Sequence, residues 1–251
     1  MSNADLLLLI VIFFATSFVG VVTGSNSLIA VPAMFQFGVP AKTAVATNMF
    51  ALVFMSVGGT IPFLRSRTID VRRILPLMLI TLVSSAAGAA LVGMITDTSV
   101  KLIVSIAMIA VAIFILIKPS AGVEPAETVS RRSLAATFIL TFLLGVYGGL
   151  FSGGYVTVLT TVLVAFFGMT FREAVASTKL INVVSSTIAT LVFMWQGLVD
   201  YRLGAILGLT MFAAAYAGAH YAVKLNDVWL KRIFLATVFL LAIKTLFDFL
   251  R

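Results

Sequence analysis

The chain has 251 residues, of which 61% are hydrophobic and only 10% are charged, and its formal net charge is +8. A soluble domain carries roughly 25% charged residues, so this composition excludes a soluble globular protein and favours one that is surrounded by lipid. The absence of cysteine excludes disulfides, thiolate metal sites and a cysteine nucleophile.

Apolar runs follow one another along the whole chain, at residues 5–37, 43–64, 74–95, 99–117, 133–167, 173–196, 203–223 and 229–250. Most of them are close to the length of about 20 residues that a helix needs to cross the hydrocarbon core. The first and fifth runs are longer, and glycine and polar residues interrupt both. We therefore expect an all-α polytopic membrane protein in which the first helix of each half is broken or re-entrant.

An internal repeat relates the two halves of the chain at a constant shift of 130 residues. Asp70 and Arg72 match Asp200 and Arg202, and Gly38 matches Gly168. Matches between scarce charged residues at one fixed shift are not expected by chance. Two homologous transmembrane repeats are therefore predicted, at residues 1–121 and 131–251, and residues 122–130 are predicted to form the linker between them.

The basic residues indicate how the two repeats face. Eight single spans would make the repeats parallel and would divide the basic residues fairly evenly between the two sides of the membrane. If each long run is a hairpin, the repeats are inverted and the division becomes more uneven. The outer side of the membrane then holds Lys42, Lys101, Arg202, Lys244 and Arg251. All the other basic residues at the ends of the runs lie on the inner side. The positive-inside rule favours this inverted arrangement.

The breaks in the two long runs are candidate binding sites. The first contains Gly24, Ser25, Asn26 and Ser27, and the second contains Ser152, Gly153 and Gly154. A helix that begins at such a break presents unpaired N–H groups and roughly half a positive charge, which favours an anion. The alternative is that the glycines only allow helices to pack closely.

A second group of candidates surrounds a lysine inside an apolar run. This group contains Ser177, Thr178, Lys179 and Asn182 in the second half, together with Thr47 and Asn48 in the first. Lys179 lies seven residues after Arg172, or roughly 10 Å along a helix, where an ionisable group is costly and marks a functional site. It could pair with a bound anion, or its amine could extend back to the membrane surface.

Motifs of enzyme chemistry are absent from the sequence. We find no nucleophile elbow, paired carboxylates, His–Glu metal motif or phosphate-binding loop. The only histidine, His220, could relay a proton, but its place before Lys224 favours an interfacial residue. We therefore expect no enzyme activity, no cofactor and no metal.

Three segments in each half form a pattern when they are taken together. In the first half they are residues 20–32, residues 44–48 and residues 70–72, and in the second half residues 145–154, 174–180 and 197–200. These segments resemble the TauE/SafE family of sulfite and sulfonate exporters. Ser25, Asn26 and Ser27 stand where the family usually has a run of glycines. The resemblance covers nearly the whole chain and implies a multi-pass transporter that is built from a duplicated unit.

The resemblance and the residues together predict a secondary transporter in a bacterial plasma membrane. We expect it to export small sulfur-containing organic or inorganic anions, such as sulfite or a sulfonate, by alternating access at the interface of inverted repeats. Its expected partners are the anionic substrate, membrane lipids, and a proton or sodium ion for coupling, and not nucleic acid. A homodimer, a passive anion channel or facilitator, and a non-catalytic membrane subunit remain open alternatives.

Overall fold

The computed structural model describes residues 2–24, 26–106, 129–226, 228–230, 232–233 and 236, and the regular elements in this part of the chain are helices. They are α1 (Asn3–Thr23), α2 (Ser27–Gln36), α3 (Ala41–Arg65), α4 (Val71–Met94), α6 (Arg131–Leu150), α7 (Tyr155–Ala165), α8 (Phe171–Trp195) and α9 (Tyr201–Lys224). A further helical stretch over residues 97–106 follows α4.

The helices fall into two length classes. Six of them, α1, α3, α4, α6, α8 and α9, are long and apolar enough to cross a membrane. Helices α2 and α7 have 10 and 11 residues, so at 1.5 Å per residue each reaches only about 15 Å, half of the hydrocarbon core. The prediction of a helical membrane protein with a broken first helix in each half is confirmed.

The repeat seen in the sequence is also a repeat of structure. Shifting α3 by 130 residues gives the bounds of α8, and the same shift turns α4 into α9. Gly24 and Gly154 both have left-handed backbone angles, with φ of 72° and 77°. Asp70 and Asp200 cap the equivalent helices α4 and α9 through their side chains. The predicted linker at residues 122–130 lies mostly outside the described residues, so the repeat boundaries remain a prediction.

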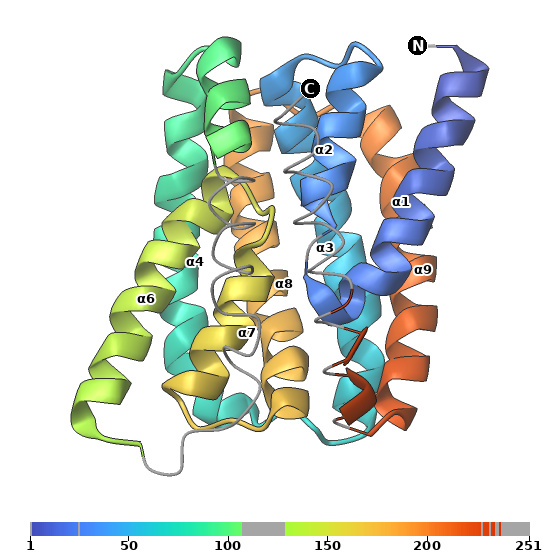
Figure 1. Cartoon of the computed structure of the whole chain (residues 1–251). Coiled ribbons are helices and arrows are strands. Elements are labelled where there is room, and N and C mark those ends of the chain that lie inside the picture. The colour runs from blue at the N-terminus through green and yellow to red at the C-terminus, as the bar shows by residue number, and fades with distance from the viewer. Residues whose placement is uncertain are drawn as a thin grey trace.

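Equivalent helices of the two halves run in opposite directions (Figure 1). Helix α1 begins at the upper end of the molecule, whereas α6 begins at the lower end, and α3 descends where α8 ascends. The packing follows the same twofold pattern, because α3 packs on α9 as α8 packs on α4, and α1 packs on α9 as α6 packs on α4. This arrangement agrees with inverted repeats.

Small residues bring helices of different repeats close together. A Cβ atom added to Gly58 of α3 would lie 2.7 Å from the carbonyl oxygen of Phe212 in α9. A Cβ atom on Gly204 of α9 would lie 2.8 Å from the ring of Phe50 in α3. Helices in membranes pack in this way because lipid supplies little hydrophobic force between them, and close contact replaces it. The two repeats therefore interlock along α3 and α9.

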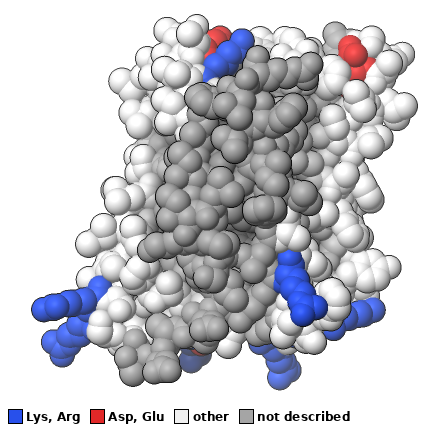
Figure 2. Space-filling view, viewed as in Figure 1, with Lys and Arg blue, Asp and Glu red and all other residues white. Residues whose placement is uncertain are grey.

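Charged residues gather at the two ends of the helices and divide unevenly (Figure 2). The lower end has Arg65, Arg67, Arg72, Arg73, Arg131, Arg132, Arg172, Lys224 and Arg232, and the upper end has Lys42, Lys101 and Arg202. Lys118, Lys231, Lys244 and Arg251 lie outside the described residues. The positive-inside rule predicts that the lower end in Figure 1 faces the cytoplasm.

Candidate functional site

Each broken helix turns back through a glycine in the left-handed conformation. Helix α1 ends at Thr23 and is capped by Gly24, and α2 starts three residues after this glycine. Helix α6 ends in the extended residue Phe151, and Gly154 caps the start of α7. Glycine suits these turns because it has no Cβ atom that would disfavour a positive φ. As a result, α2 and α7 both begin inside the protein rather than at its surface.

The two hairpins touch at their turns. The hydroxyls of Ser27 and Ser152 are 2.7 Å apart, which joins the start of α2 to the break before α7. The hydroxyl of Thr157 donates to the carbonyl oxygen of Thr23 at 2.6 Å. A Cβ atom on Gly24 would lie 2.9 Å from the backbone nitrogen of Thr157, so the backbones leave no room for a side chain there. The breaks of the two repeats therefore form one junction.

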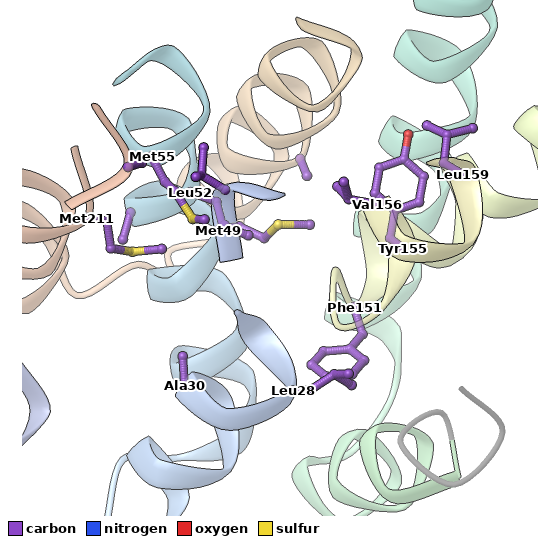
Figure 3. Packing of buried hydrophobic residues seen from close by; sticks show 14 of the residues in the cluster. Leu28, Ala30, Met49, Leu52, Met55, Phe151, Tyr155, Val156, Leu159 and Met211 are labelled. Atoms are coloured by element: carbon purple, nitrogen blue, oxygen red, sulfur yellow. The ribbon is translucent and has the colours of Figure 1, made fainter. Parts of the chain in front are cut away.

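A narrow cavity lies beside this junction. Its lining comes from both hairpins and from α3 and α8, and consists of Gly20, Val21, Gly24, Asn26, Ser27, Leu52, Met55, Ser56, Ser152, Val156, Lys179 and Asn182. Figure 3 shows Met55, Leu52 and Val156 extending toward the space between the two repeats. The cavity volume is about 20 Å³, and one water molecule needs roughly 10–15 Å³. A larger ligand would therefore require the cavity to widen.

Lys179 is the charged residue of the cavity. It extends from α8, and only 4% of its surface is exposed, which argues against an amine that reaches back to the membrane surface. None of the residues that line the cavity is acidic. Within the part of the chain that the structure describes, the Lys179 ammonium has no hydrogen-bond or ion-pair partner. An unpaired buried charge is costly, so an anion that enters the cavity would offset this cost.

Helix ends add to the positive potential of the cavity. Asn26 and Ser27 belong to the start of α2, and Val156 is the second residue of α7. The first N–H groups of a helix have no partner within the helix, and each N-terminus is equivalent to about half a positive charge. When Lys179 is protonated, the two N-termini and its ammonium together supply about two positive charges at one place.

Amide and hydroxyl groups complete the polar side of the cavity. The Asn182 amide donates to the Ser56 hydroxyl at 2.6 Å, and the Asn48 amide donates to the Ser27 hydroxyl at 2.9 Å. The side-chain carbonyl oxygens of Asn26 and Asn48 are buried and have no hydrogen-bond partner among the described residues. Such open acceptors can bind the hydrogens of a ligand or of the water that accompanies it. The cavity thus offers both a cation and hydrogen-bonding groups.

The structure brings about half of the predicted site residues together around the cavity. The predicted residues that line the cavity are Gly24, Asn26, Ser27, Ser152, Lys179 and Asn182. Asn48 lies one hydrogen bond away through Ser27. Gly153 and Gly154 form the turn before α7, where the Tyr147 hydroxyl donates to the Gly153 carbonyl. Ser25 lies outside the described residues.

The remaining three predicted residues have other contacts. The Thr47 hydroxyl accepts from the backbone N–H of Asp200 at 3.0 Å, at the start of α9. The Thr178 hydroxyl donates to the Val175 carbonyl at 2.9 Å, and Ser177 is buried without a hydrogen-bond partner in the described part. None of the three lines the cavity. The reason is helical rotation, since neighbouring residues of a helix point about 100° apart.

Some lining residues were not predicted from the sequence. The principal one is Ser56, which follows Asn48 by eight residues on α3 and therefore lies on the same helical face. Gly20 precedes Gly24 by one helical turn on α1. Helical spacing from the predicted residues would have indicated both. The apolar lining residues Val21, Leu52, Met55 and Val156 carry no comparable signal in so apolar a sequence.

Two broken helices that meet at a buried polar cavity inside a bundle of spanning helices are typical of secondary transporters. The comparison with known families agrees with this class. A family model described as "Sulfite exporter TauE/SafE" matches residues 8–245, and the chain belongs to this family. The resemblance found in the sequence is thereby confirmed.

Relatives of known name support the same class. The chain is 28% identical to "Probable membrane transporter protein ORF9" of a Sinorhizobium species, over 96% of this chain and 92% of the relative. It is 24% identical to a "Probable membrane transporter protein" of Haemophilus influenzae, over 97% and 96%. It is 25% identical to "Probable membrane transporter protein YfcA" of Escherichia coli K12, over 96% and 91%. No solved structure matches the chain. The protein is a multi-pass bacterial membrane transporter of the TauE/SafE type.

Proposed function

We propose that the protein is a secondary transporter that exports small sulfur-containing organic or inorganic anions by alternating access. The observation that carries the proposal is Lys179, a buried cation in a cavity without a carboxylate, at the junction of the two repeats. A substrate anion would supply the charge that the cavity lacks. The description of the matching family, which names sulfite export, supports a sulfur anion as the substrate.

The electrostatics of the cavity suit a small, strongly charged group. Lys179 and the starts of α2 and α7 together offer about two positive charges. A sulfite or sulfonate group spreads its negative charge over three oxygens, which can contact the ammonium, the Ser27 and Ser152 hydroxyls, and helical N–H groups at the same time. The repeat equivalent of Lys179 is Met49, so the cavity has one cation and suits one anion at a time.

The inverted arrangement supports alternating access. The pair α3–α9 packs against α1, and its counterpart α8–α4 packs against α6. Each pair would therefore take the role of the other when the repeats exchange roles. An opening at one end of the molecule would then have an equivalent at the other end, with the cavity between them. The present cavity is too narrow for an oxyanion, as expected for a conformation closed around its binding site.

Ligand binding tests the proposal first. The thermal stability of the purified protein would be measured with sulfite, sulfate, thiosulfate, sulfoacetate, taurine, acetate and chloride. A ligand that binds only the folded state stabilises it by roughly 2.7 kcal/mol at 100 times its dissociation constant. We expect a selective rise with a sulfur anion that Lys179→Ala abolishes. Stabilisation of the variant equal to that of the parent protein would contradict the role of Lys179.

Transport by the protein in liposomes tests the mechanism. A carrier with one site that faces each side in turn exchanges labelled substrate for unlabelled substrate, so we expect counterflow and saturation. Flux that neither saturates nor shows counterflow would instead establish a passive anion channel. Imposed proton and sodium gradients test the coupling that the sequence led us to expect. Export would be favoured if the imposed gradient drives substrate from the face that carries the basic helix ends.

A further inference from the structure

A second hollow lies at the basic end of the molecule, between the end of α3 and the end of α9. Its lining includes Arg65 and Ser66 from the α3 end, and Tyr216, His220 and Lys224 from α9. Its volume is about 310 Å³, far larger than the cavity at Lys179, and the two share no lining residue. The hollow is therefore a separate feature, outside the proposed transport site.

The chemistry of the hollow is basic and hydroxylic. The Arg65 guanidinium donates to the Tyr216 hydroxyl at 3.4 Å, and both Arg65 and Lys224 are exposed. No lining residue is acidic. The acidic side chains described at this end, Asp70 and Glu173, accept hydrogen bonds from the N–H groups that begin their own helices. The two cations of the hollow are thus available to a phosphate or another anion.

The equivalent place in the other repeat indicates that this part of the surface faces lipid. There, at the ends of α8 and α4, Gln196 replaces Ser66, and its amide donates to the carbonyl of Ala90 at 3.2 Å, which fills the groove. Trp195 and Met94, the counterparts of Arg65 and Lys224, are 86% and 82% exposed. Large apolar side chains exposed at a helix end lie against lipid, as aromatic residues commonly do at the membrane surface.

We propose that this hollow binds the phosphate of an anionic phospholipid of the cytoplasmic leaflet. Arg65 and Lys224 would contact the phosphate oxygens, and the Tyr216 hydroxyl, which accepts from Arg65, would donate to an oxygen that remains. Basic pockets between spanning helices on the cytoplasmic side are known sites for such headgroups. Pro62 is buried beneath the hollow, and the hollow lies on the membrane face of α3 and α9. Both features favour a phosphate that carries acyl chains over a free phosphate ion. Because α3 and α9 belong to different repeats, the lipid would bridge the two halves.

Thermal stability in detergent tests the site with three probes: phosphatidylglycerol, phosphatidylcholine and inorganic phosphate. We expect phosphatidylglycerol to stabilise the protein at much lower concentration than phosphatidylcholine, and inorganic phosphate to have no effect. In the double variant Arg65→Gln/Lys224→Gln, the concentration of phosphatidylglycerol that gives half the effect should rise roughly 30-fold, from the loss of two interfacial cations. An equal response to inorganic phosphate would overturn the proposal in favour of a soluble anion.

Two further variants separate a built site from a general charge effect. The control Arg72→Gln/Arg132→Gln removes two cations from the same end but outside the hollow, and should leave the lipid response unchanged. The variant Ser66→Gln keeps both cations and fills the hollow as Gln196 fills its counterpart, so it should weaken the lipid response. An unchanged response in Ser66→Gln, or an equal loss in the control, would overturn the proposal. Ser66→Gln also decides the matter if the double variant fails to fold.

Discussion

Replacing Lys179 by methionine should have opposite effects on stability and on ligand binding. The substitution removes the buried charge and keeps an unbranched side chain of similar length. The repeat itself provides the precedent, since Met49 is the counterpart of Lys179 and is buried at 1% exposure on the equivalent helix α3. The variant therefore isolates the charge from the packing.

The expected size of each effect follows from the surroundings of the ammonium. Because no acidic residue lines the cavity, the charge is a cost in the ligand-free protein, and its removal should stabilise that form by about 1–3 kcal/mol. An anion bound beside the two helix starts would lose its only full counter-charge in the cavity. Loss of one partner from a buried charge pair costs about 2–5 kcal/mol, so the dissociation constant should rise at least roughly 30-fold.

Thermal unfolding of both proteins, with and without the sulfur anion that binds best, measures the two effects together. The ligand-free variant should unfold at a temperature several degrees higher, and the anion should no longer raise that temperature. The control Lys101→Met removes an exposed lysine and should change neither quantity by more than about 0.5 kcal/mol. A ligand-free variant less stable than the parent protein would refute the reasoning, because Lys179 would then have a structural partner.

Four other substitutions, in three experiments, test the packing and the junction. Gly58→Ala places a Cβ atom 2.7 Å from the carbonyl oxygen of Phe212, and should lower the free energy of unfolding by about 1–3 kcal/mol in chemical denaturation. A double-mutant cycle of Ser27→Ala and Ser152→Ala should give a coupling free energy of roughly 0.5–1.5 kcal/mol, and a value near zero would show that their contact is unimportant. Thr47→Val removes the acceptor of an N–H group at the start of α9, so it should lower stability by about 1–3 kcal/mol while leaving the dissociation constant of the anion unchanged.

The sequence predicts the fold well because its strongest signals are local and physical. Charged residues are scarce, so their matches at one shift reveal the repeat, and clusters of glycine in overlong apolar runs reveal the hairpins. Lys179 also stands out, because a lysine inside an apolar run has few structural explanations. These signals require no knowledge of how the helices are rotated.

The composition of the site is harder to predict because it depends on that rotation. Thr47, Thr178 and Ser177 lie next to other predicted residues in the sequence, but none of the three lines the cavity. Ser56 lies two helical turns from Asn48 and lines the cavity, although nothing in its immediate sequence marks it. Thr47, Thr178 and Ser177 were predicted because they adjoin other polar candidates in the sequence. Ser56 would have been predicted from helical periodicity.

The difference between Lys179 and Met49 also bears on the energies of the transport cycle. If the two repeats were identical, the conformations open to either side of the membrane would be related by exchange of the halves and would have the same free energy. Every unequal pair removes this degeneracy. Lys179 with Met49 and Asn26 with Val156 are two such pairs, and Lys179, Asn26 and Val156 line the cavity. The resting preference of the protein for one side is therefore set by positions at which its halves have diverged, and exchanging the residues of such a pair at the cavity should shift it.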